Sequence, residues 1–333
     1  MADMTYRQLG RFGLRVSPLA VGTANFGMVT DEPDAHRILD RALDAGINFV
    51  DTADNYNAGD TEQIVGNWLA GDARRREQTV LASKVYYPPN KYTSRDPIER
   101  SGAHAGPNGY GLSARHIRMA CDASLRRLRT DYIDIYQMHH VDRLTPIEET
   151  WDAMQTLVAQ GKVISVGSSN FAGWHLARAC ETAKNRHFTA PVSEQSLYNL
   201  CSRTVELELL PACQAYGVGF LAFSPLANGL LGGISESGAR RKFAQYNLAD
   251  ETRTRIERFE KLAADLGHTP GSVAIAWLLS RPSVTAVILG PRTIEQLEDA
   301  LQAVPITLAD DTLSRLDELF PGPGGAAPEA YAW

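Results

Sequence analysis

The sequence alternates eight times between a short run of β-branched and apolar residues and a longer amphipathic stretch. The short runs are residues 19–22, 48–51, 79–84, 132–139, 163–167, 192–195, 219–223 and 284–289. Strands that alternate with helices along one chain form a parallel sheet with helical crossovers. Eight such units close a (β/α)8 barrel, and we expect this TIM barrel as a single domain over residues 1–333. An open, doubly wound sheet of eight strands is the alternative.

Three amphipathic stretches carry helix signals. One apolar face ends before Gly46 and consists of Ala35, Ile38, Leu39, Ala42 and Leu43. A second face, before the fourth strand, consists of Ile117, Ala120, Cys121, Ser124, Leu125 and Leu128. After that strand we expect Thr145 to be a helix N-cap, with Pro146 as the first helical residue. Glu148 would complete a capping box, and Gly161 would end the helix.

Further segments lie outside the regular strand and helix repeat. Residues 6–9 and 14–16 are expected to form a β-hairpin that precedes the barrel and caps its bottom. Two connections, 85–112 and 224–250, are longer than ordinary loops, and both follow a predicted strand. In a barrel such connections lie at the C-terminal face, where barrel enzymes hold their sites. We therefore interpret them as long loops for substrate and cofactor.

Charge and composition exclude several classes of protein. The net charge is −6, from 33 basic and 39 acidic residues, so no overall attraction to nucleic acid or anionic lipid is expected. No apolar run reaches the ~20 residues that a membrane helix needs, and the first residues lack the apolar segment of a signal peptide. The four cysteines have no C-x-x-C spacing, which argues against a metal site. We expect a cytoplasmic protein, and the oligomeric state stays open, a homo-oligomer included.

Four residues that can do chemistry fall at the ends of consecutive predicted strands. Asp51 ends the second strand and Tyr56 follows it, Lys84 ends the third and His139 ends the fourth. Each has an ordinary structural explanation when taken alone, such as a helix cap or a hydrogen-bonded core histidine. In a barrel, however, the C-terminal ends of strands converge on one mouth. The four side chains are therefore candidates for a single catalytic site.

Seven short segments resemble the signature segments of the aldo-keto reductases. They are Asp-Thr-Ala-Asp-Asn-Tyr at 51–56, Ala-Ser-Lys at 82–84, Asp-Ile-Tyr-Gln-Met-His at 134–139, Gly-Ser-Ser-Asn-Phe at 167–171, Gln-Ser-Leu-Tyr-Asn at 195–199, Phe-Ser-Pro-Leu at 223–226 and Gly-Pro-Arg-Thr at 290–293. The resemblance extends from about Tyr6 to Phe320, with the segments in family order. It implies a barrel that binds NADP(H) across its mouth, which agrees with the absence of a G-x-G-x-x-G fingerprint.

The resemblance implies a reduction of aldehydes or ketones in which Tyr56 is the general acid. Carbonyl reduction needs a hydride on carbon and a proton on the developing alkoxide, and a phenol with an ordinary pKa near ~10 can supply that proton. A neighbouring Lys84 would make Tyr56 a stronger acid, and Asp51 would keep Lys84 charged. His139 would donate a hydrogen bond to the carbonyl oxygen. His140 would point the other way by strand alternation.

The same matching assigns the cofactor contacts. Ser169, Asn170 and Gln195 are expected to bind the nicotinamide carboxamide, and Phe223 to stack on its ring. Backbone amides near Leu226, Gly229 and Leu230 are expected at the pyrophosphate, and Arg292 at the 2′-phosphate. The remaining expected contacts are Gly22, Thr23, Ser224, Gly290 and Gln296.

Two positions depart from the family pattern. Asn57 follows the tyrosine where glycine is common, and Ala300 stands where many members have an asparagine that contacts adenine. The second departure weakens the expected contacts with the adenosine end, and the resemblance still favours NADPH and NADP, with NAD the less favoured cofactor.

A narrower resemblance, to one branch of the family, indicates the class of substrate. Residues 136–143, 166–174 and 320–333 are similar to a bacterial branch of the family that includes reductases of nucleotide-linked keto-deoxysugars and other natural-product ketones. This similarity implies a role in deoxysugar biosynthesis. In the 85–112 connection, stacking on rings is expected of Tyr86, Tyr87, Tyr92 and Tyr110. Binding of a diphosphate is expected of Lys91, Arg95, Arg100 and His104.

Three alternatives to this substrate and mechanism stay open. The first is a generic carbonyl reductase of broad specificity. The second is a regulatory subunit that binds the cofactor, like the potassium-channel β subunits that share the fold. The third is a barrel enzyme in which Lys84 forms a Schiff base with its substrate.

Overall fold

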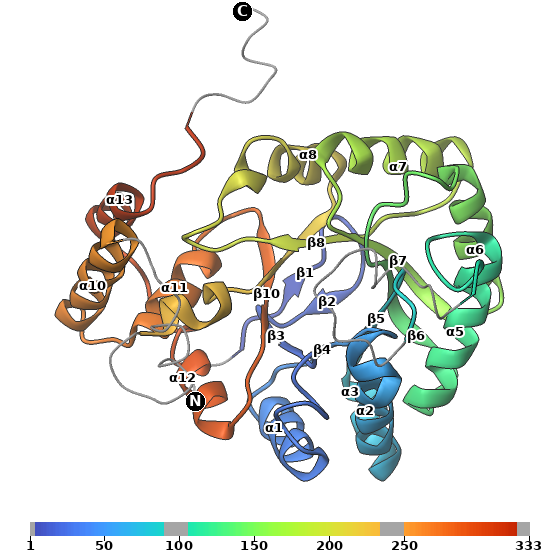
Figure 1. Cartoon of the computed structure of the whole chain (residues 1–333), viewed down its shortest axis with the longest axis horizontal. Coiled ribbons are helices and arrows are strands. Elements are labelled where there is room, and N and C mark those ends of the chain that lie inside the picture. Colours follow the sequence, from blue (N-terminus) through green and yellow to red (C-terminus); the bar gives the residue numbers. More distant parts are fainter. Residues whose placement is uncertain (1–3, 90–105, 234–249, 325–333) are drawn as a thin grey trace, which may run out of the picture.

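The structure, a computed structural model, describes residues 4–89, 106–233 and 250–324. Eight parallel strands form a closed barrel in the order β10-β3-β4-β5-β6-β7-β8-β9 (Figure 1). The strands are β3 Leu19–Gly22, β4 Phe49–Asp51, β5 Val80–Val85, β6 Ile133–Met138, β7 Val163–Ser169, β8 Ser193–Leu197, β9 Gly219–Phe223 and β10 Val284–Leu289. Because β10 pairs with β3, the sheet has no edge, and the expected (β/α)8 barrel is confirmed over the open sheet.

Helices surround the barrel in the described part of the chain (Figure 1). They are α1 Glu32–Asp44, α2 Asp60–Gly71, α3 Ala73–Gln78, α5 Ala114–Leu128, α6 Ile147–Ala159, α7 Gly173–Asn185, α8 Leu209–Tyr216, α10 Asp250–Asp265, α11 Pro270–Leu279, α12 Ile294–Leu301 and α13 Asp310–Leu319. Three short 3-10 helices are η1 Tyr56–Gly59, η2 Thr204–Glu206 and η3 Ala227–Gly232. None of the described helices is long and apolar enough to cross a membrane.

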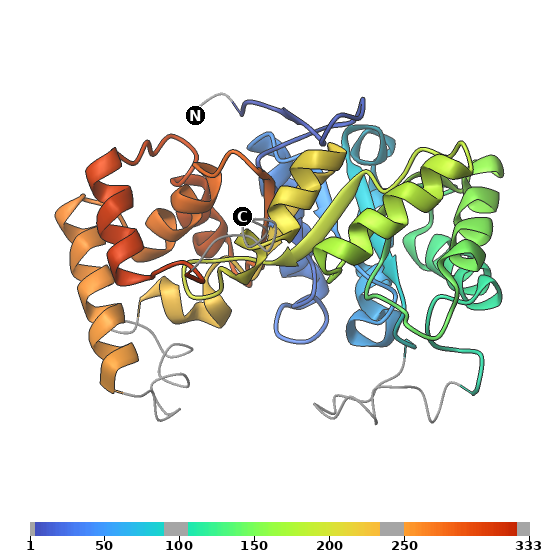
Figure 2. The ribbon, with the colours of Figure 1, turned by 90° about the horizontal axis from the view of Figure 1, so that it is seen from above.

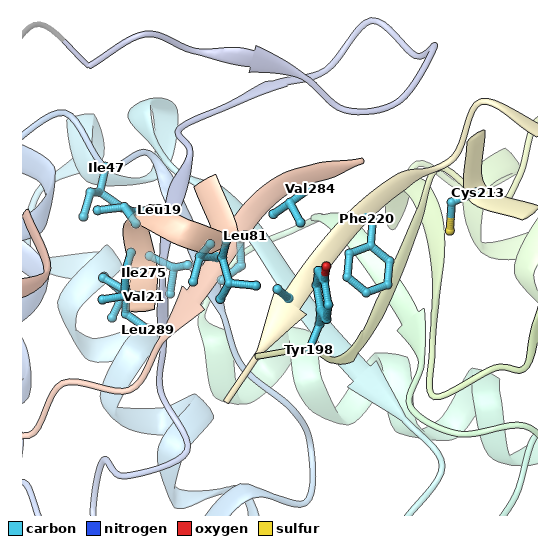
Figure 3. Close-up of a cluster of buried hydrophobic side chains, with 14 of the residues drawn as sticks. Leu19, Val21, Ile47, Leu81, Tyr198, Cys213, Phe220, Ile275, Val284 and Leu289 are labelled. Atoms are coloured by element: carbon cyan, nitrogen blue, oxygen red, sulfur yellow. The ribbon is translucent and has the colours of Figure 1, made fainter. Parts of the chain in front are cut away.

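Two apolar cores hold the barrel together. Strand residues that point outward pack against the helices, and Figure 3 shows Val21 of β3, Leu289 of β10 and Ile275 of α11 side by side in this outer core. Inward-pointing residues, among them Phe49 and Ile135, form a separate core inside the barrel. Since side chains alternate along a strand, the next inward residues on these two strands are Asp51 and Gln137. The barrel interior is thus apolar toward the N-terminal ends of the strands and polar at their C-terminal ends.

The predicted hairpin closes the barrel at the opposite end from the polar layer. β1 Arg7–Gln8 pairs antiparallel with β2 Arg15–Val16, and the pair lies along one edge of the molecule in Figure 2. Leu9 and Val16 are fully buried members of the inner core. Arg11 N–H donates to the Gly217 carbonyl at 2.8 Å, just before β9 begins. The prediction that the hairpin caps the bottom of the barrel is confirmed.

One helix start was wrongly predicted. Pro146, and not Thr145, is the N-cap of α6, and no side chain caps this helix. Thr145 Oγ1 donates instead to Asp142 Oδ2 at 2.8 Å, so the expected capping box does not form. The other end is as expected, because Gly161 follows the C-cap with a positive φ of 72°. The predicted apolar faces of α1 and α5 are buried, apart from the partly buried Leu43 and Leu125.

Candidate active site

The C-terminal ends of three neighbouring strands bring the four predicted catalytic residues together. Asp51 ends β4, Lys84 lies near the end of β5, and His139 directly follows β6. Tyr56 opens η1, the short 3-10 helix that follows β4. Strand pairing fixes the register, because Asp51 is opposite Ala82 and Lys84 is opposite Gln137. The four side chains therefore meet at one mouth, as strand periodicity requires.

Lys84 is the centre of this group. Its Nζ donates to Asp51 Oδ2 at 2.6 Å, to the Thr52 carbonyl at 2.9 Å and to the Tyr56 hydroxyl at 3.1 Å. The side chain is completely buried. Burial alone would lower the pKa of Lys84, but Asp51 and Tyr56 outweigh it, and the pKa is raised. All three ammonium protons are accepted and the charge is stabilised, which argues against a Schiff-base role for this lysine.

Asp51 is held by two glutamines as well as by Lys84. Its Oδ1 accepts from Gln195 Nε2 at 2.8 Å and from Gln137 Nε2 at 3.0 Å. All of these groups are buried, so each hydrogen bond acts in a medium that screens charge weakly. Gln137 was not predicted as a site residue. The available signal was its position two residues before His139, on the same face of an otherwise apolar strand.

Tyr56 is a weaker acid in this structure than the sequence suggested. Burial is the largest influence and raises the pKa of the phenol, while the charge and hydrogen bond of Lys84 oppose it. Lys84 thus lowers the pKa of Tyr56 as expected, but the net direction is upward. The reason is desolvation, because a phenolate in this buried position loses more hydration than one lysine returns. Tyr56 consequently keeps its proton at neutral pH.

His139 lies between two tyrosine rings and is uncharged. Its ring centroid is 5.9 Å from that of Tyr56 and 5.3 Å from that of Tyr87, both in edge-to-face geometry. Burial, the charge of Lys84 and the neighbouring His140 lower the pKa of His139 well below its ordinary value. A neutral imidazole donates one hydrogen bond and holds no proton to release as an acid. This arrangement favours Tyr56 as the acid and His139 as a hydrogen-bond donor.

The residues expected at the nicotinamide lie beside this group. Ser169 ends β7, and Asn170 follows it with a φ of +58°. Asn170 Nδ2 donates to the His139 carbonyl at 3.1 Å and to Ser169 Oγ at 3.0 Å. Gln195 donates a hydrogen bond to Asp51, as described above, and half-buried Phe223 ends β9. The structure thus brings all four to the mouth of the barrel, and their contact with a cofactor stays a prediction.

The residues expected at the cofactor phosphates lie after β9 and β10. Leu226, Gly229 and Leu230 belong to the turn around η3, where Gly229 has a φ of +97° and free space where a Cβ would be. Arg292 is exposed, and within the described chain its guanidinium has no hydrogen bond or ion pair. Its backbone N–H donates to Gln296 Oε1 at 2.8 Å.

The remaining expected cofactor residues have structural partners. Thr23 Oγ1 and N–H both donate to the Asp51 carbonyl, and the Ser224 carbonyl accepts from Asn199. The Gly290 carbonyl accepts from Asn25. Gly22 lies so close to β10 that a Cβ there would be 2.7 Å from the Leu289 carbonyl oxygen, which explains the glycine by packing. A role for these residues toward a cofactor stays a prediction.

The two departures from the family pattern have clear positions. Asn57 has a φ of +45°, the left-handed conformation that glycine adopts readily, so the position directly after Tyr56 takes this conformation without glycine. Ala300 is buried in the outer core.

Three predicted tyrosines of the 85–112 connection form a cluster beside His139. Ring centroids are 4.9 Å apart for Tyr86 and Tyr87 and 4.7 Å apart for Tyr86 and Tyr110. Tyr86 also lies 5.4 Å from the ring of His140. The other residues predicted to contact a bulky substrate lie outside the described part of the chain: Lys91, Tyr92, Arg95, Arg100 and His104.

A comparison with sequence models of protein families shows to which family the chain belongs. The sequence model of the aldo/keto reductase family matches residues 18–320. The chain belongs to the aldo/keto reductase family. It is therefore an oxidoreductase of carbonyl compounds, and members of this family use nicotinamide cofactors.

Individual relatives of this aldo/keto reductase extend over nearly its whole length. It is 50% identical to an uncharacterized oxidoreductase of Bacillus subtilis, YrpG, over 99% of this chain and 100% of the relative. It is 32% identical to the versiconal hemiacetal acetate reductase of Aspergillus parasiticus, covering 95% of this chain and 97% of the relative. A probable voltage-gated potassium channel subunit beta of Oryza sativa is 34% identical over 91% of this chain and 92% of the relative. The expected bacterial deoxysugar branch is not distinguished by these relatives.

Proposed function

We propose that this protein is an NADPH-dependent carbonyl reductase in which Tyr56 protonates the substrate oxygen. The observation that carries the proposal is the hydrogen-bonded series Asp51–Lys84–Tyr56, with distances of 2.6 and 3.1 Å, beside an uncharged His139. A partly buried phenol in contact with a buried ammonium is suited to proton donation, because the ammonium stabilises the phenolate that is left.

The residues at the mouth fit a phosphorylated dinucleotide. Arg292 offers an exposed guanidinium that has no other partner in the described chain, and its planar fork suits phosphate oxygens. Space around Gly229 allows a backbone approach to a pyrophosphate. When bound, the cofactor would supply the hydride. Ser169, Asn170 and Gln195 would hold its carboxamide and fix the face that it presents.

The side chains of this protein would act on the substrate oxygen. His139 would donate a hydrogen bond to the carbonyl and fix its direction. As negative charge develops on that oxygen, the Tyr56 hydroxyl would transfer its proton to it. Lys84 would stabilise the resulting phenolate, and Asp51 would keep Lys84 charged throughout. The site would then take up one proton from solvent to restore the phenol.

Two substrate classes follow from the sequence. The first is a nucleotide-linked keto-deoxysugar or another natural-product ketone. Tyr87 lies beside His139, and Tyr86 and Tyr110 belong to the same cluster, so these tyrosines could stack on the rings of such a substrate. The second is a broad set of simple carbonyl compounds. A kcat/KM far higher for a keto-sugar nucleotide than for the free keto-sugar would support the first class. Equal kcat/KM on simple aldehydes, without inhibition by millimolar nucleoside diphosphate, would support the second.

A regulatory role is the second candidate, because relatives of this chain are named as potassium channel subunits. Such a subunit would bind the cofactor and turn over slowly. Steady-state oxidation of NADPH by a panel of aldehydes and ketones tests the two directly. Sustained turnover supports the reductase, and a single turnover without further consumption of NADPH would overturn it.

A further inference from the structure

A cavity of about 390 Å³ opens beside the catalytic centre, and of its lining residues only Asn170 has a role in the mechanism above. It lies between the connections that follow β6, β7 and β8, and its walls include His140 and Asn170. Asn170 joins it to the catalytic group, since its Nδ2 donates to the His139 carbonyl at 3.1 Å. The volume is within the range of small-molecule sites, which is roughly 300–1,000 Å³. A substrate that reaches His139 could therefore extend into this space.

One wall of the cavity carries unused polar groups. Arg143 makes no hydrogen bond or ion pair in the described chain. His175 is only 9% exposed, and neither of its ring nitrogens has a partner among the described residues. Burial and the charge of Arg143 lower the pKa of His175, so its ring is neutral, with one N–H donor and one acceptor. A buried polar group without a partner is unfavourable, and a ligand oxygen at this imidazole would relieve that.

The nearby carboxylates do not neutralise Arg143. Glu208 Oε1 accepts from the Gly173 N–H at 2.9 Å. Glu194 is buried and accepts hydrogen bonds from Ser168, and from Ser196 and the Phe171 N–H of the cavity wall. Among the residues that the structure describes, no aspartate or glutamate lines the cavity. The lining therefore carries a positive charge, that of Arg143.

The rest of the lining combines apolar side chains with three hydroxyl residues, Ser196, Ser202 and Thr204. Phe171, Val205 and Leu209 contribute side chains to the wall. Leu197, also in the wall, is 41% exposed, and Trp174 is 58% exposed with its ring stacked on His175 at a centroid distance of 3.4 Å. Exposed apolar side chains around a concave surface are typical of a binding site. Such a wall suits a flat apolar body, with an aromatic ring as the simplest case.

We propose that this cavity binds the part of the substrate remote from the carbonyl, and that this part is an apolar body bearing an oxyanion held by Arg143 and His175. The oxyanion is a carboxylate or a phosphate monoester, both of which accept hydrogen bonds from a guanidinium. The inference rests on the proposed reductase function, and it adds the chemical class of the substrate. It assigns Arg143 and His175 to substrate recognition and leaves the proton transfer to Tyr56.

Paired aldehydes test the charge requirement. NADPH oxidation is measured with 4-carboxybenzaldehyde and with its neutral methyl ester, for the wild type, Arg143→Ala, His175→Phe and the control Arg118→Ala. Arg118 is an exposed arginine of α5 that does not line the cavity. We expect Arg143→Ala to raise the KM for the carboxylate by roughly tenfold or more, with kcat and the KM for the ester unchanged. Equal changes for both aldehydes, or the same change in Arg118→Ala, would overturn the proposal.

A binding measurement separates this proposal from the reductase activity. Trp68, Trp151 and Trp277 are at most 1% exposed, and Trp333, which lies outside the described residues, is replaced by Phe in every protein used for this measurement. Quenching of tryptophan fluorescence then reports on exposed Trp174, whose ring stacks on His175 of the cavity wall. Benzoate and phenyl phosphate are titrated into the wild type, Arg143→Ala and Trp174→Phe. Quenching by either anion that weakens about tenfold in Arg143→Ala supports the site, and the stronger anion identifies the oxyanion. No saturable quenching by either would overturn the site even if NADPH oxidation is normal, and binding without NADPH oxidation would overturn only the reductase.

Discussion

Lys84 donates from its ammonium to the hydroxyl oxygen of Tyr56 over 3.1 Å; Lys84 is buried and Tyr56 is partly buried. The hydroxyl oxygen thus accepts a hydrogen bond from a cation while its own proton stays free for a substrate. Removing that proton leaves a phenolate next to a positive charge, which is the arrangement that stabilises the product of proton transfer. The pair therefore links the fold, which places β4 and β5 side by side, to the proposed chemistry.

The pH dependence of the reduction follows from the two uncharged groups. The pKa of Tyr56 is raised above its ordinary value of 10.0 and that of His139 is lowered below 6.5. Neither group changes its charge at pH values between these two pKa values. The rate of NADPH oxidation in a single turnover should therefore be constant from about pH 7 to about pH 9. Glu194 titrates in this window, and the measurement is therefore repeated in Glu194→Gln. A rate that falls with a midpoint near pH 7 in both proteins would identify an imidazolium as the acid.

Glu194 makes stability depend on pH in the opposite sense to most carboxylates. Burial raises its pKa from 4.5 to about 7, against the hydrogen bonds of Ser168 and Ser196. A carboxyl with a higher pKa in the folded state stabilises the fold below its unfolded pKa and loses that contribution as pH rises through the folded pKa. The free energy of unfolding of Glu194→Gln relative to wild type should thus increase by about 2–3 kcal/mol from pH 4.5 to pH 8. Urea unfolding at the two pH values measures it, and a constant difference would refute the assignment.

Arg292 should distinguish the two nicotinamide cofactors. Arg292→Ala is expected to weaken NADPH binding by ~1.5–3 kcal/mol, the usual net contribution of a hydrogen bond to a charged group. NADH binding should hardly change, because the 2′-phosphate is the group that separates the two molecules. Fluorescence titration with each cofactor provides the measurement, and exposed Arg118→Ala on α5 serves as the control. Equal weakening of both cofactors would place Arg292 away from the 2′-phosphate.

The barrel could be predicted because its determinants are local. Each strand needed only a short β-branched run, and the ends of the strands then placed Asp51, Lys84 and His139 at one mouth. Strand ends shifted by one or two residues, as at Ser169, where β7 continues past the predicted Gly167. Boundaries of this kind depend on pairing with neighbours, which a single run does not encode.

Features that depend on tertiary contacts were not predicted. Thr145 has the chemistry of an N-cap, but Asp142 takes its hydroxyl, and the helix begins without it. The upward pKa of Tyr56 results from burial, which outweighs the charge of Lys84 that the sequence made visible. The cavity at Arg143 and His175 requires three separate connections to converge, and no pattern within any one of them indicates it.

The most direct test of the proposed mechanism is the turnover of Tyr56→Phe. The substitution removes the hydroxyl and keeps the ring, and Tyr6→Phe, at the start of the chain's described part, is the matched control. If Tyr56 is the acid, kcat for NADPH-dependent carbonyl reduction should fall by ~10²–10⁴-fold or more. The Kd for NADPH should stay within about twofold of wild type, because a charge-neutral loss of one hydroxyl is not expected to remove cofactor contacts. A Tyr56→Phe enzyme that keeps more than about half of the wild-type kcat would contradict the account.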